Sequence, residues 1–137
     1  MAAANSNEQS AEAKPAPRAL SDGELDALLR EHRFGVLATV KRSGHPHLST
    51  VVQQWDPEER TVRISATRDR LKVRHIRRDP RVALHVDGPD VWSFAVVEGD
   101  ATVVPDPEGE TEDRVTIEVR ATRLYGTSLD FPSGPTG

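Results

Sequence analysis

The chain has 137 residues, a formal net charge of −4 and no cysteine, and aromatic side chains make up only 4% of it. This length fits one domain with a modest core. The lack of cysteine excludes disulfides, thiolate nucleophiles and cysteine-ligated metal or iron–sulfur sites. Few aromatics and a negative net charge also disfavour a nucleic-acid-binding protein.

The predicted elements begin with a helix at Ser21, where Ser21 and Glu24 have the spacing of a capping box; Leu25, Leu28 and Leu29 form its buried stripe, and the helix ends near His32. A second, basic helix is expected around residues 69–79. Gly99 indicates a bulge or bend in a long strand. Apolar runs and alternation predict six strands, at 34–40, 45–54, 61–66, 81–86, 92–104 and 114–122. Six strands with two short helices predict a mainly β fold, an antiparallel barrel or sandwich.

The two ends of the chain differ in composition from its middle. Residues 1–19 are polar and rich in Ala, and residues 127–137 are rich in Pro and Gly. We therefore expect a folded domain at 20–126 between a disordered N-terminal tail and a flexible C-terminal tail. The first residues lack the charged start and apolar core of a signal peptide, and no stretch has the roughly 20 apolar residues of a membrane span. A cytoplasmic protein is the expectation.

The segment Ala66–Pro80 contains six of the eighteen Lys and Arg residues of this acidic chain. Asp69 is the expected helix cap and Pro80 the expected stop, which places Val73 and Ile76 on the buried side.

The basic residues of this segment divide into two groups. Arg68, Arg70 and Lys72 lie near the helix start, where free backbone N–H groups already favour an anion, so a phosphate or carboxylate site is one interpretation. A broader outer stripe is formed by Arg70, Arg74, Arg77 and Arg78. A solvated basic face explains the same pattern, and on the residues alone both interpretations remain open.

Other chemistry finds weaker support. His45 and His47 lie on the same face of a strand and could begin a metal site, but no third ligand has a convincing spacing, so no metal is predicted. Ser49, Ser65 and Ser93 lack the context of a nucleophile elbow. Phosphate-binding glycine loops are absent from the sequence.

Four motifs in order carry a resemblance to a known family. The motifs are Phe34–Val40 (FGVLATV), Gly44–Val51 (GHPHLSTV), Arg70–Leu84 (RLKVRHIRRDPRVAL) and Trp92–Gly99 (WSFAVVEG). They resemble split β-barrel flavin-binding proteins related to pyridoxamine 5′-phosphate oxidase, and more specifically the actinobacterial branch that uses the deazaflavin coenzyme F420. The similarity spans about 34–126.

The resemblance implies a homodimer of six-stranded antiparallel split β-barrels with cofactor sites at the subunit interface. It implies phosphate binding at the junction of strand and helix by Ser65, Arg70 and Lys72, with Trp92 lining the interface. The outer arginines Arg74, Arg77 or Arg78 would neutralise the anionic tail of F420. The ring system would lie along the second strand, against His45, Pro46, His47, Ser49 and Thr50.

The implied function is an F420-dependent oxidoreductase that transfers a hydride between reduced F420 and an organic acceptor. Such a site mainly orients the two reactants and excludes water. His47 and Tyr125 are weak candidates for a proton donor. The alternatives are an FMN-binding oxidoreductase of the same fold and a non-catalytic cofactor-binding protein. The implied partners are a second copy of the chain and a small-molecule substrate, with no nucleic acid or membrane.

Overall fold

The structure, a computed structural model, describes residues 16–108 and 113–130, of which Asp130 is described by its backbone alone. Residues 16–19 and 127–130, which were predicted to belong to the two tails, form strands that pair with each other. The rest of both predicted tails lies outside the described residues. No helix in the described part of the chain is long and apolar enough to cross a membrane.

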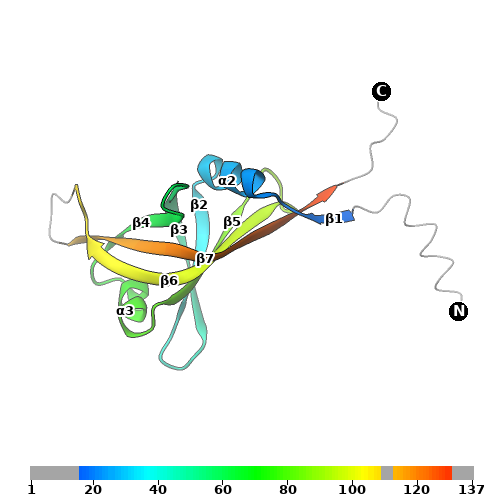
Figure 1. The fold of residues 1–137 in the computed structure, drawn as a ribbon. Helices are drawn as coiled ribbons and strands as arrows, with labels where there is room; N and C mark the ends of the chain where they lie inside the picture. The colour runs from blue at the N-terminus through cyan, green and yellow to red at the C-terminus, as the bar shows by residue number, and fades with distance from the viewer. Residues whose placement is uncertain (1–15, 109–112, 131–137) are drawn as a thin grey trace, which may run out of the picture.

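Six strands close into an antiparallel barrel, which confirms the predicted fold class (Figure 1). The order around the barrel is β7-β4-β3-β2-β5-β6, and β6 pairs again with β7 to close it. The seventh strand, β1, adds to the free end of β7 outside the barrel. The strands are β1 (Ala16–Ala19), β2 (Phe34–Val40), β3 (Pro46–Asp56), β4 (Thr61–Thr67), β5 (Arg81–Asp87), β6 (Phe94–Pro105) and β7 (Arg114–Asp130).

The strand boundaries follow the alternation in the sequence, with two extensions. β3 continues through Trp55 and Asp56, which were predicted to form a turn, and β7 continues eight residues beyond the predicted end at Thr122. Tyr125 therefore lies within β7. Inward-facing side chains fill the barrel as predicted for β7, where Val115, Ile117 and Val119 are buried.

A bulge interrupts the β6–β7 ladder between Glu98 and Gly99, as predicted. A Cβ atom on Gly99 would overlap the backbone carbonyl oxygen of Arg120, so the close approach of the two strands requires glycine there. The bulge lets two long strands bend around the barrel and close it.

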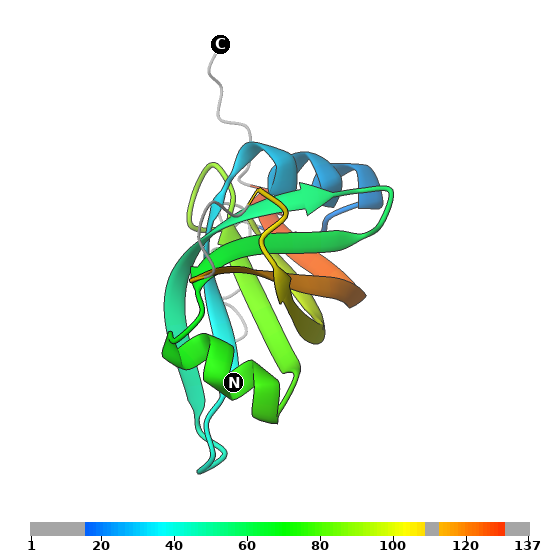
Figure 2. The same ribbon diagram turned by 90° about the vertical axis from the view of Figure 1, so that its left-hand side faces the viewer.

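Helix α2 (Asp22–Glu31) starts with the predicted capping box, in which Ser21 accepts from the Glu24 backbone N–H and the Glu24 carboxylate accepts from the Ser21 N–H. Its buried stripe is Leu25, Leu28 and Leu29. The fully buried Gln53 amide of β3 donates to the carbonyls of Leu29 and His32, which fixes the helix on the barrel. α2 and the basic helix α3 (Leu71–Arg78) lie on opposite sides of the barrel (Figure 2).

Helix α3 (Leu71–Arg78) differs from its prediction at the start. Its N-cap is Arg70, with no capping side chain, so the prediction of Asp69 was wrong. The reason is a turn that precedes the helix, in which the Arg70 N–H donates to the Thr67 carbonyl. Because of this turn, the helix begins at Leu71, after the predicted start. Val73 and Ile76 are buried as predicted.

Candidate functional site

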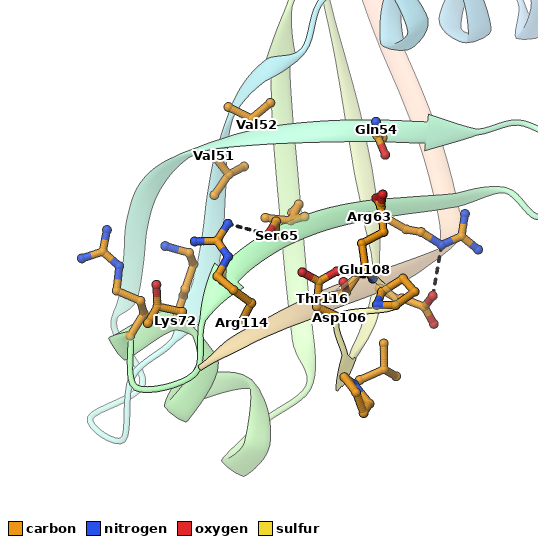
Figure 3. A pocket seen from close by; sticks show the side chains of 18 of the residues that line it. Val51, Val52, Gln54, Arg63, Ser65, Lys72, Asp106, Glu108, Arg114 and Thr116 are labelled. Atoms are coloured by element: carbon orange, nitrogen blue, oxygen red, sulfur yellow. Dashed lines mark hydrogen bonds and ion pairs between the residues drawn. The ribbon is translucent and has the colours of Figure 1, made fainter. Parts of the chain in front are cut away.

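A groove of about 690 Å³ runs along β3 and β4, next to the start of α3 and the start of β7 (Figure 3). Outward-facing side chains of the strands line most of it, and the core residues Val51, Ile64 and Ala66 also border it. The residues that line it are Arg33, Thr50, Val51, Val52, Gln54, Arg63, Ile64, Ser65, Ala66, Thr67, Arg70, Lys72, Val104, Pro105, Asp106, Pro107, Glu108, Arg114, Thr116 and Glu118.

Three cationic side chains gather at one end of the groove. Arg70 and Lys72 come from the first turn of α3, and Arg114 comes from the start of β7, where it pairs with Thr67 of β4. The Arg114 guanidinium donates to Ser65 Oγ at 2.6 Å, which orients both groups toward this end. Within the described part of the chain, none of the three cations has a carboxylate within ion-pair distance.

The charge of this cationic end is not compensated by the protein. Burial lowers the pKa of the half-buried Lys72 ammonium, and the neighbouring Arg70 guanidinium lowers it further. An anion placed between these side chains would oppose both effects and would favour the charged form of Lys72. The arrangement is therefore suited to a phosphate or carboxylate group.

The rest of the groove is mixed in character. Thr50, Val51 and Val52 of β3 line it near the cationic end, and Val51 is also part of the barrel core. The view in Figure 3 shows Lys72 and Arg114 at the opposite end from Gln54 and Arg63. Asp106 and Glu108 also line the groove, so its positive charge is confined to parts of it.

Arg63 is already neutralised by two carboxylates. It donates to Asp56 and to Glu118, each at 3.0 Å. These bonds raise the pKa of Arg63, and the Arg63 guanidinium holds the pKa of Asp56 below its usual value. Arg63 is therefore occupied by its own ion pairs, unlike the cations beside α3.

Four of the predicted cofactor residues come together in the groove: Thr50, Ser65, Arg70 and Lys72. The sequence interpretation did not include Arg114, which is separated from Ser65 by 49 positions and meets it only through the β4–β7 pairing. The alternation of residues 114–122 could have indicated Arg114, because it predicts that Arg114 and Thr116 lie on the same outer face of the strand.

The other predicted site residues lie elsewhere on the single chain. His45 and Pro46 are exposed at the start of β3, and Trp92 is half exposed in the connection between β5 and β6. Ser49 Oγ is buried without a hydrogen-bond partner in the described structure. Tyr125 lies under the Arg123 guanidinium, which is 4.3 Å from the ring centroid.

His47 belongs to a separate cluster on the side of the barrel that α3 covers. Its ring contacts the His75 ring edge-on at 5.0 Å between centroids, and His75 Nδ1 shares a hydrogen bond of 2.9 Å with Thr39 Oγ1. No group of three or more potential metal ligands occurs among residues 16–108 and 113–130. Arg78 donates to the carbonyl of Val40 and, like Arg74 and Arg77, does not line the groove.

Comparison with known proteins agrees with this architecture. The family model described as pyridoxamine 5′-phosphate oxidase matches residues 21–128. A solved structure of an F420 reductase is 30% identical, with 72% of this chain and 94% of that chain covered and a TM-score of 0.64.

Two further solved structures share the fold. A FAD-binding protein from Mesorhizobium loti is 20% identical, covers 85% of this chain and 98% of its own, and has a TM-score of 0.71. General Stress Protein 26 from Bacillus anthracis is 20% identical, with 78% of this chain and 93% of that chain covered and a TM-score of 0.66. The family match over most of the chain and the closed barrel confirm the resemblance in the sequence: the chain belongs to the pyridoxamine 5′-phosphate oxidase family of split β-barrel proteins, which includes oxidoreductases.

Proposed function

We propose that the chain binds coenzyme F420 in the groove and transfers a hydride between the reduced coenzyme and an organic acceptor. The observation that carries the proposal is the group of uncompensated cations, Arg70, Lys72 and Arg114, that line one end of the groove. The choice of F420 over a flavin is supported by the F420 reductase that is 30% identical to this chain.

The residues of the groove fit such a cofactor. A phosphate group at the cationic end would accept hydrogen bonds from Lys72 and Arg114, and Ser65 would keep Arg114 in place. The ring system would lie along β3 beside Thr50 and the exposed Leu48, on the side of the phosphate that faces away from Gln54. When bound, the reduced deazaflavin supplies the hydride, and the protein holds the ring beside the acceptor.

The described lining of the groove contains no imidazole and no phenol. Neither His47 nor Tyr125, the two sequence candidates for a proton donor, lines it. Within one chain, binding and orientation are therefore the main contributions of these side chains, and a proton would come from solvent or from a second copy.

We also propose that the functional form is a homodimer. The outer face of β2 and β3 exposes a group of apolar side chains, among them Phe34 at 69%, Leu48 at 64% and Val52 at 45% exposure. The strand register puts Phe34 opposite Val52 and Ala38 opposite Leu48, so these side chains form one continuous face. Because Val52 also lines the groove, a second copy on this face would cover the edge of the site.

Sedimentation of the purified protein tests the dimer. We expect a mass of two chains for the wild type and of one chain for Leu48→Asp, because a buried unpaired carboxylate is unfavourable in an apolar interface. A control with Arg42→Gln, in the exposed turn between β2 and β3, should stay dimeric. A monomeric wild type at micromolar concentration would contradict the proposal.

Titration with each cofactor tests the function. Purified protein is titrated separately with F420 and FMN while cofactor fluorescence is followed, and the reduced cofactor is then offered quinone, enone and nitro acceptors. Saturable F420 binding with acceptor-dependent oxidation supports the proposal. Tight binding of FMN without F420 binding would favour the FMN-dependent alternative, and binding without turnover of any acceptor would favour a cofactor-binding protein.

A further inference from the structure

The groove does not end at Arg63. A second cavity of about 530 Å³ begins there, and Arg33, Gln54 and Arg63 line both spaces. The second cavity continues past Trp55 and Pro57 toward α2. The two cavities are neighbours along β3, and together they are called the trough below.

The arginines in the distal half of this trough differ in their pairing. Arg63 is held by Asp56 and Glu118, and Arg30 is held by Asp26 at 3.1 Å. Arg33 is exposed, and within the described ranges it has no ion pair and no side-chain hydrogen bond. Arg33 is therefore the cation of the distal half that remains available to a ligand.

The backbone fixes the place of Arg33. Its carbonyl accepts a 2.7 Å hydrogen bond from the Gln53 N–H, so the residue sits beside the point where β3 passes α2. The residue after Gln53, Gln54, is exposed and lines both cavities together with Arg33, so its amide offers a further donor to a ligand there.

Strand geometry gives the separation between the two ends. Arg114 pairs with Thr67 at the cationic end, and Gln54 pairs with Arg63 at the other end. Thr67 and Arg63 are four residues apart on β4, and a rise of about 3.3 Å per residue puts them about 13 Å apart. A ligand that contacts both ends must span on the order of this distance.

We propose that the trough binds an elongated ligand with two anionic groups, one at Arg70, Lys72 and Arg114 and the second at Arg33 with Gln54. The proposal rests on the proposed function and assigns the carboxylate tail of F420 to Arg33. It replaces the assignment from the sequence, since Arg74, Arg77 and Arg78 do not line the trough. FMN, which carries a single phosphate end, would leave Arg33 unoccupied.

The test compares two ligands across four proteins. Dissociation constants for F420 and for FMN are measured by fluorescence with wild type, Arg33→Gln, Arg77→Gln and Arg42→Gln. Arg42 lies outside the trough, so Arg42→Gln removes one positive charge, as Arg33→Gln does, but leaves the lining of the trough unchanged. Arg33→Gln should weaken F420 about tenfold and FMN less than twofold, since one charge-assisted contact is lost only for the longer ligand.

The possible outcomes separate the two proposals. An unchanged ratio of F420 to FMN affinity in Arg33→Gln, with binding intact, would overturn the assignment of Arg33 and leave the proposed function standing. A loss of F420 affinity in Arg77→Gln but not in Arg33→Gln would instead put the tail on α3. Failure of the wild type to bind either cofactor would overturn the proposed function and this inference with it.

Discussion

Replacement of Lys72 by methionine removes the half-buried charge of the cationic end while preserving the length of the side chain. A hydrogen bond to a charged group contributes about 1.5–3 kcal/mol. Because Lys72 is half-buried, we take about 2 kcal/mol, which corresponds to an increase of about 30-fold in the Kd for the phosphate-bearing cofactor. The exposed Arg70 should contribute less, about 1 kcal/mol or about fivefold for Arg70→Gln.

The pH dependence of binding gives a second, independent measure of Lys72. Its pKa lies below the usual 10.5 in the free protein, and a bound anion would raise it. Binding therefore takes up protons once the pH exceeds the lowered pKa, so wild-type affinity should fall as the pH rises through that range. Lys72→Met should lose this alkaline decline.

Fluorescence titration at several pH values, with Arg42→Gln as the control, measures both effects. A Kd within twofold of wild type for Lys72→Met would refute the placement of the phosphate at this end. An alkaline decline that persists in Lys72→Met would show that another group causes it.

Three predictions concern stability. Thr39→Val leaves the buried His75 Nδ1 without its partner and should cost about 1–3 kcal/mol in denaturant unfolding, whereas Thr39→Ser should retain the hydrogen bond. Burial, followed by the influence of His47, Arg78 and Lys41, lowers the pKa of His75 below 6.5, so wild-type stability should fall as the pH drops below about 6.5. His75→Phe should show a weaker pH dependence, and an identical slope would argue against this role. Gly126→Ala should cost about 1–3 kcal/mol or more, because the new Cβ would meet the Phe94 carbonyl oxygen, and Leu25 Cδ2 at 2.9 Å; an unchanged Tm would contradict the close packing.

Much of the fold was predictable because most strands carry their own alternation. β2 was predicted at its observed bounds, and the α2 capping box is a local pattern of two residues. β1 could not be predicted, since Ala16–Ala19 has no apolar alternation and exists only because β7 extends far enough to pair with it. The prediction of Asp69 as the helix cap was wrong because a turn in the preceding residues places the start of the helix later in the sequence.

The candidate site was predictable only where its residues are close in sequence. Arg70 and Lys72 are part of one basic segment, and Ser65 precedes it by a few residues. Arg114 reaches the site through strand pairing, and Arg33 belongs to no motif, so only the barrel reveals either one. The positions of His45 and His47 were implied by family resemblance, and on the single chain they lie apart from the groove.

The pairing of β7 has a consequence for the order of events during synthesis. β7 joins β1, β4 and β6, all of which leave the ribosome before it. Until its first residues emerge, Ser65 has no Arg114 beside it, and the wall formed by Thr116 and Glu118 does not exist. A nascent chain would therefore be unable to load its cofactor before the barrel closes. A cofactor that binds afterwards would hold β4 and β7 together and slow the separation of these two strands.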